Sequence, residues 1–489
     1  MRNGAPIAED KARAEPATRS LSWRVELLIF TITLLLLLWP LAINGAPFYS
    51  PDSASYLRGG GFGFNTGLLI LGHWWDSLVG ATQVAATSAS PKAIVADAIA
   101  KSGGARSAIY SVATYLLRAP GNSLTALAVV QAGAVALVVS CLGRLTAPEA
   151  GLWPRLAVGA GVALLTPAAW YSAYAVPDIL AGVTVGGAVV LIIFFDRIPA
   201  VLRVTLVLLL AFAIAAHASH LLIAASVLVA GAAASFWLQR PSLQRAIWFA
   251  SPLVLAVLGL LGTSYAAFGE ASLAPKRYPI QLARSVADGP GYWYLRDHCG
   301  TEHYAICELY GSNPPRKVGD FLWGSNGVRY RATQKQMDRI RAEESTIVRR
   351  AAMAYPLVQL RQAVTNSVRQ LFSIGMRELV FGVRLTGPEP ALTQVDPDRP
   401  ALKAVGRALS YLSFFGSILL LVLLRRRLMR TEKAAIGVIA IGLFTNAAVC
   451  GALSGVTDRY QARVAWILPA LAFAILARVL SARAKPALA

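Results

Sequence analysis

Long apolar runs with almost no charge recur along this chain, and they constrain its fold more than any other feature. The first occupies residues 24–43 and contains five consecutive leucines at 34–38. A helix needs roughly 20 mostly apolar residues to cross a bilayer. No clear cleavage site follows the first run, so it is predicted to remain as a helix and not to be removed as a signal peptide. We therefore expect an all-α polytopic membrane protein with about ten transmembrane helices, near residues 24–43, 123–142, 156–173, 179–195, 204–216, 221–238, 246–265, 409–424, 434–453 and 464–480.

Composition excludes several other classes of protein. Hydrophobic residues make up 56% of the 489 residues and charged residues only 15%, whereas soluble domains average about 45–50% and about 25%. Disordered, collagen-like and small disulfide-rich chains are excluded on these grounds. The net charge of +21 would indicate nucleic-acid binding in a soluble protein. Membrane proteins concentrate Lys and Arg in cytoplasmic loops, however, so we expect no nucleic-acid partner.

Basic residues fall in alternate segments between the expected helices. All of these segments lie on one side of the membrane if both termini are cytoplasmic, as the positive-inside rule requires. The chain is thus expected to be a multi-pass protein of the bacterial inner (cytoplasmic) membrane. The basic residues are Arg2, Lys11, Arg13, Arg19, Arg144, Arg155, Arg197, Arg203, Arg240, Arg245, Arg425, Arg426, Arg427, Arg430, Lys433, Arg478, Arg483 and Lys485.

This topology divides the chain into four parts. Residues 1–23 form a cytoplasmic tail, 24–265 carry helices one to seven and a long first outer loop at 44–122, 266–406 form a periplasmic segment, and 407–489 carry the last three helices and a cytoplasmic tail. The periplasmic segment is long enough for a small α-rich or mixed domain. It contains Cys299 and Cys307, which we expect to form a disulfide in an oxidising compartment. A metal site that combines these thiols with His298 and His303 is the alternative, although the arrangement lacks a familiar zinc spacing.

Acidic residues are scarce, and two stand at the expected outer edges of the membrane. Asp52 lies about nine residues beyond the first apolar run, directly after Pro51. Asp178 follows Pro177 in the short outer turn between helices three and four. Each could simply cap the helix that follows its proline. The other interpretation, compatible with capping, is a functional carboxylate that deprotonates an acceptor hydroxyl or binds a divalent metal.

Three further groups of polar residues stand at the same outer edge. His217 and His220 lie in the turn between two short apolar runs, where they could bind a metal or phosphate or satisfy a helix end. Arg459 precedes the last run, where its planar guanidinium could bind phosphate, and the adjacent Tyr460 could instead be an interfacial residue. Arg106 lies in an amphipathic segment, residues 104–117, that could contact a lipid carrier or only anchor at the surface.

The order of these features along the chain resembles that of the C-type (GT-C) membrane glycosyltransferases. The shared features are a cytoplasmic N-terminus, an early Asp in a long first outer loop, a Pro-Asp turn between helices three and four, an Arg-Ser-x-x-Tyr surface helix before helix two, and Arg459-Tyr460 before the last helix. The likeness covers most of the chain as architecture and only short stretches as motif. One departure is that Asp52-Ser53 stands where many members have two adjacent acidic residues.

The resemblance implies a transferase that moves a sugar from a polyprenyl-phosphate donor to a lipid, glycan or protein acceptor of the cell envelope, on the periplasmic side. Asp52 would be the general base and Asp178 a metal or donor contact, with Mg or Mn as the candidate metal held by the two carboxylates. Membrane lipids would surround the helices. The donor or its phosphate would be bound by Arg58, Arg106, His217, His220, Arg459 and Tyr460.

Two other interpretations of the same pattern stay open. An envelope polysaccharide polymerase or ligase shares a large outer loop but depends on Arg and His, so His217, His220 and loop arginines would matter more than the aspartates. A lipid or solute transporter would need ionisable residues near the middle of the membrane, where the expected helices are nearly bare of charge.

Overall fold

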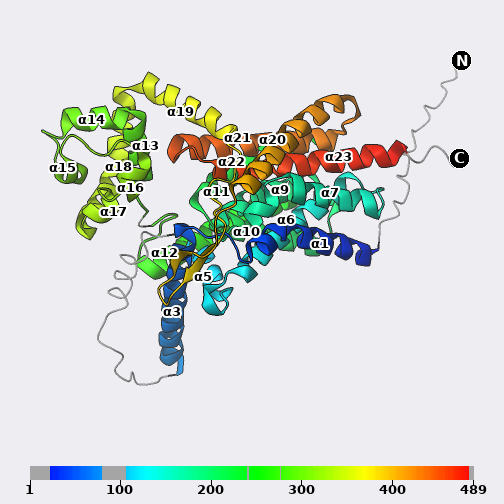
Figure 1. Ribbon diagram of the computed structural model, residues 1–489, viewed down its shortest axis with the longest axis horizontal. Helices are drawn as coiled ribbons and strands as arrows, with labels where there is room; N and C mark the ends of the chain where they lie inside the picture. Colours follow the sequence, from blue (N-terminus) through cyan, green and yellow to red (C-terminus); the bar gives the residue numbers. More distant parts are fainter. Residues whose placement is uncertain (1–21, 80–105, 239–241, 276, 484–489) are drawn as a thin grey trace, which may run out of the picture.

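The computed structural model of the protein describes residues 22–79, 106–238, 242–275 and 277–483. Regular structure in these ranges is almost entirely helical (Figure 1). Seven segments are long and apolar enough to cross a membrane, and the protein is therefore an all-α membrane protein. They are Trp23–Asn44 (α1, Trp23–Leu37, and α2, Trp39–Asn44), Thr125–Thr146 (α6), Ala218–Leu238 (α11), Leu243–Phe268 (α12), Pro400–Leu423 (α20), Arg430–Leu453 (α21) and Asp458–Arg483 (α22, Asp458–Ala465, and α23, Ile467–Arg483). Three further apolar helices at expected positions are shorter: Leu152–Leu165 (α7), Leu180–Ile193 (α9) and Ala200–Ala215 (α10).

Two of the expected spans are divided, and proline explains both divisions. The first breaks between α1 and α2, where Pro40 in the first turn of α2 has no amide to continue the helical hydrogen bonds. The run at 156–173 divides into α7 and the short α8 (Ala168–Ser172). Thr166 is extended there, with ψ of 168°, because the residue before a proline avoids the helical conformation. The single helix expected over 156–173 is therefore wrong.

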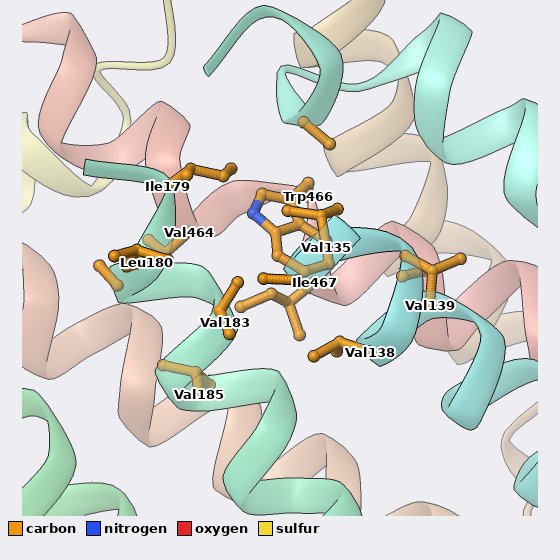
Figure 2. Close-up of a cluster of buried hydrophobic side chains, with 14 of the residues drawn as sticks. Val135, Val138, Val139, Ile179, Leu180, Val183, Val185, Val464, Trp466 and Ile467 are labelled. Carbon is orange, nitrogen blue, oxygen red and sulfur yellow. The ribbon is translucent and has the colours of Figure 1, made fainter. Parts of the chain in front are cut away.

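Small residues let the helices of the bundle pack closely. Figure 2 shows α6, α9 and the junction of α22 and α23 meeting in one apolar cluster, which includes Val138, Val183 and Trp466. Gly182 of α9 permits a very close approach, since a Cβ atom there would lie 2.5 Å from the carbonyl oxygen of Arg463. Helix association in lipid depends on such small residues, because lipid tails are as apolar as the helix surface. The helix after Asp178 is thereby held directly against α22.

The two ends of the bundle differ. Figure 1 shows the start of α1 and the end of α23 at one end, while helices α13 to α18 form a separate lobe at the other. The lobe has its own hydrophobic core, which includes Leu282, Phe321 and Ile340. A disulfide joins Cys299 to Cys307 within it, the pairing that the sequence predicts. Its helices are α13 (Ile280–Asp288), α14 (Pro290–His298), α15 (Ala305–Tyr310), α16 (Val318–Trp323), α17 (Val328–Arg331) and α18 (Gln334–Ala354).

Several further elements lie at the lobe end of the bundle (Figure 1). The described parts of the expected outer loop 44–122 contain α3 (Pro51–Val79) and α5 (Ala108–Leu116), which pack against each other. After the lobe, α19 (Pro356–Leu371) packs against α21. An antiparallel hairpin of β1 (Val383–Thr386) and β2 (Ala391–Gln394) then leads into α20.

Candidate functional site

Two loops that are far apart in the sequence are joined beside the start of α3. The backbone of Phe48 pairs with the loop at 173–175 in a short parallel bridge, with N–O distances of 2.8 and 2.9 Å. The Nε2 amide of Gln131 in α6 supports this loop by donating to the carbonyl oxygens of Ser172 and Tyr174. The start of α3, with Asp52, is thus held next to the 3₁₀ turn η2 (Pro177–Ile179), with Asp178.

The carboxylate of Asp52 binds two arginines from distant parts of the chain. Nη2 of Arg106 donates to Oδ1 at 2.5 Å, and Nη1 and Nη2 of Arg459 both lie 3.2 Å from Oδ2. Pro51 begins α3, so the carboxylate also lies in the first helical turn, where the helix dipole favours negative charge. The structure therefore brings together three residues that the sequence places in one functional group.

The capping residue of α5 positions Arg106. Ser107 caps this helix by accepting from the amide of Tyr110 at 3.3 Å, and its hydroxyl donates to the carbonyl oxygen of Ala215 at the end of α10. The Tyr110 hydroxyl donates to Oε1 of Gln131, the side chain that supports the loop beside Asp52. The chain directly after Arg106 is thus fixed to α10 through Ser107 and to α6 through Tyr110.

Asp178 binds a different arginine, which lies deeper in the protein. Nη1 of Arg463 donates to Oδ1 of Asp178 at 3.1 Å. The same guanidinium donates to Oδ1 of Asn446 from Nε and Nη2, to the hydroxyl of Ser219 and to Sγ of Cys450. Arg463 is completely buried, so Asp178 and Arg463 form an interior ion pair that joins η2 to α22 and α21.

The site therefore has an accessible layer and a buried layer. The side chains of Asp52, Arg106 and Arg459 are 21%, 28% and 18% exposed, whereas those of Asp178 and Arg463 are 8% and 0% exposed. Arg459 and Arg463 stand four residues apart in α22 and so lie on the same helix face. Three guanidiniums face two carboxylates, which leaves the group with an excess of positive charge.

Of the two histidines, only His217 is connected to Arg463 of the buried layer, through the hydroxyl of Ser219. The Ser219 amide donates to Nδ1 of His217 at 3.2 Å, and the Ser219 hydroxyl lies 2.9 Å from the same atom. Neutral His217 therefore carries its hydrogen on Nε2. His220 instead donates from Nδ1 to the carbonyl oxygen of Ala213, and its buried Nε2 has no hydrogen-bond partner among the described residues. The two rings lie 5.4 Å apart.

Charged neighbours set the protonation of the group at neutral pH. Burial acts to raise the pKa of Asp52, but Arg106 and Arg459 outweigh it and hold that pKa below its ordinary value. Burial lowers the pKa of His217 to about 3, and the neighbouring guanidiniums act in the same direction. The site at neutral pH thus contains an ionised carboxylate and an uncharged imidazole.

Two other residues expected at the site have different surroundings. Nη1 of Arg58 donates to the carbonyl oxygen of Pro390 at 2.9 Å, next to the hairpin, so its contact lies away from the Asp52 carboxylate. The ring of Tyr460 lies 5.1 Å from the guanidinium carbons of both Arg459 and Arg463. Tyr460 thus supports the two arginines by cation–π contacts.

Two charged residues, Arg463 and Glu378, lie at the candidate site although they are not among the site residues predicted from the sequence. Arg463 could have been found from its spacing, because it follows Arg459 by one helical turn. Glu378, between α19 and β1, carries no such signal. Its Oε2 is buried and has no hydrogen-bond partner within the described ranges. Burial and the nearby charge of Asp458 raise the pKa of Glu378, while Arg459 acts in the opposite direction.

The two aspartates do not suit the Mg or Mn ion that the resemblance implies. Both carboxylate oxygens of Asp52 are bound by guanidiniums, and Asp178 is bound by a third. A divalent cation there would face three positive charges at close range. In the part of the chain that the structure describes, no group of three or more His, Cys, Asp or Glu residues could hold a metal. The arginines are the source of positive charge at this site.

No protein-family model matches the chain, and no curated protein or solved structure is significantly similar to it. The geometry and charge of the site are therefore the basis for its assignment.

Proposed function

We propose that this protein is a membrane glycosyltransferase that moves a sugar from a polyprenyl-phosphate donor to a lipid, glycan or protein acceptor of the envelope. The reaction would take place on the periplasmic face of a bacterial inner membrane, with about ten spans, both termini in the cytoplasm and the lobe of α13–α18 outside. The observation that carries the proposal is the carboxylate of Asp52 between the partly exposed guanidiniums of Arg106 and Arg459.

The two accessible arginines would bind the donor phosphate. A guanidinium presents its N–H groups in a planar fork that matches two oxygens of a phosphate. The phosphate carries more negative charge as it leaves the sugar, and fixed positive charge stabilises that change in the transition state. Arg463 lies one turn behind Arg459 and adds to the positive field while it holds α22 in place through Asp178.

In the proposed step, the acceptor oxygen forms a bond to the anomeric carbon of the sugar while the bond from that carbon to the phosphate oxygen breaks. The electron pair of the broken bond leaves with the polyprenyl phosphate. The proton of the acceptor hydroxyl passes to the carboxylate of Asp52. Donor phosphate would share Arg106 and Arg459 with Asp52, which would return the pKa of Asp52 toward its ordinary value of about 3.9. The base would therefore become stronger only when the donor is bound.

The first test compares envelope lipids and glycans by mass spectrometry in a deletion strain and in complemented strains. Wild type should restore one sugar-bearing species, and Asp52→Asn should fail to restore it at equal protein level in the membrane. The matched control is Asp196→Asn, because Asp196 pairs with Arg245 near the opposite end of α9, at the 3₁₀ turn η3 (Phe195–Arg197). Full restoration by Asp52→Asn would refute the assignment of the base.

The same experiment separates the alternatives. A polymerase or ligase would tolerate Asp52→Asn and fail with His217→Asn, because its chemistry depends on Arg and His. A transporter would leave the profile of sugar-bearing species the same in the deletion strain and in every complemented strain.

A further inference from the structure

A cavity with both apolar and charged lining residues lies at the end of the bundle opposite Asp52. It has a volume of about 160 Å³, is open on one side, and is lined by residues of α1, α6 and the chain from η3 to the start of α10. Its polar lining includes Glu26, Ser140, Arg144 and Arg197. The cavity is smaller than the roughly 300–1,000 Å³ of pockets that enclose a whole drug-sized ligand. It therefore suits the small polar part of a ligand whose remaining part extends outside the cavity.

The charges around the cavity are not balanced. Glu26 is paired with the buried Arg155, whose Nη1 lies 2.6 Å from Oε1 of the carboxylate. Arg144 is 3.9 Å from the same carboxylate oxygen and does not hydrogen-bond to it. Among the residues that the structure describes, Arg197 has no ion-pair partner. Since Arg155 already neutralises Glu26, the cavity retains the positive charge of Arg144 and Arg197.

The remaining lining is apolar and leads to the outer surface of the bundle. Phe30, Leu137 and Leu202 form the walls, and the hydroxyl oxygen of Ser140 is buried without a hydrogen-bond partner in the described residues. Leu27 and Val201, on the helices that flank the cavity, are 53% and 79% exposed. On a membrane protein such exposed apolar side chains face acyl chains.

We propose that this cavity binds the headgroup of an anionic phospholipid. Arg144 and Arg197 bind the phosphate, the Ser140 hydroxyl donates to one of its oxygens, and an acyl chain follows the apolar wall to the lipid-facing surface. Basic pockets between membrane helices bind anionic headgroups in this way. Free phosphate shares the charge but gains nothing from the apolar wall, so the lipid is the favoured source. The inference does not depend on the proposed glycosyl transfer.

Native mass spectrometry of the full chain in a neutral detergent tests the proposal. The probe is dioleoylphosphatidylglycerol, with dioleoylphosphatidylcholine as the lipid of no net charge. At about 1 kcal/mol for each arginine, or roughly fivefold, Arg144→Gln/Arg197→Gln should weaken phosphatidylglycerol binding about 30-fold. Arg425→Gln/Arg426→Gln is the matched control, because it removes two exposed charges at the same end of the bundle away from the cavity and should retain wild-type affinity.

Three results would overturn the proposal. They are equal binding of the two lipids by the wild type, equal loss in the cavity and control variants, and displacement of bound phosphatidylglycerol by excess inorganic phosphate. Thermal unfolding without added lipid shows whether Arg144→Gln/Arg197→Gln is folded. Leu137→Trp provides a second measurement, since it fills the cavity without a change in charge and should also reduce phosphatidylglycerol binding.

Discussion

Replacement of Arg463 by methionine should strongly destabilise the protein, because it would leave the buried carboxyl group of Asp178 without its partner. The side chain of Arg463 is completely buried and that of Asp178 is only 8% exposed. Removal of one partner from a buried ion pair costs about 3–5 kcal/mol. The acceptors on Ser219 and Asn446 would also lose their donor. We therefore expect Arg463→Met to lower the free energy of unfolding by at least about 3 kcal/mol.

Removal of both charges should restore much of this loss. Asp178→Asn alone leaves a buried guanidinium unpaired and should cost a similar amount, whereas Asp178→Asn/Arg463→Met leaves no buried charge. The double variant should therefore be more stable than the sum of the single variants predicts, by about 2–3 kcal/mol.

The assay is a double-mutant cycle on the purified full chain, with unfolding free energies from titration of the detergent-solubilised protein with sodium dodecyl sulfate. The control cycle uses Glu308→Gln and Arg339→Met, an exposed ion pair of the lobe, which should show little coupling. Single-variant costs that add to within about 0.5 kcal/mol at Asp178 and Arg463 would refute the reasoning, because independent sites add to that accuracy.

Three further predictions follow from close contacts and charge. Gly182→Ala should lower thermal stability and loosen α22, because its Cβ would lie 2.5 Å from the Arg463 carbonyl oxygen; unchanged melting would contradict this. Glu378 has a raised pKa in the folded state, so the wild type should lose stability as the pH rises above about 4.3. The free energy of unfolding of Glu378→Gln, measured at about pH 4 and pH 8, should not show this loss. Arg58→Gln should leave donor affinity within about threefold, whereas Arg106→Gln should lower it about tenfold or more; equal losses in a binding titration would be the contrary result.

The sequence alone determined the class of fold. A backbone in lipid must satisfy its own hydrogen bonds, so a run of about 20 apolar residues can only be a helix. Every expected run contains helix, although Pro40 and Pro167 divide two of them. The disulfide could also be expected, because Cys299 and Cys307 lie in the segment that the positive-inside rule places in an oxidising compartment.

The candidate site could be predicted only in part. The sequence identifies Asp52, Arg106 and Arg459 as polar residues at the expected outer edges of apolar runs, where charge is unusual. Arg58 has similar chemistry but contacts the hairpin, since side chains on one helix can face different neighbours. Glu378 lies in a loop between two elements, and no periodicity indicates where such a segment will lie.

Only the tertiary structure decided which charges meet. Asp52 and Arg459 are 407 residues apart in the sequence, and each aspartate had several arginines available to it. Apolar periodicity specifies which face of a helix is buried but not which helix covers it. That choice depends on packing, such as the contact of Gly182 with α22, and on the bridge between Phe48 and the loop at 173–175. Long-range packing therefore assigns Arg459 to Asp52 at the surface and Arg463 to Asp178 in the interior.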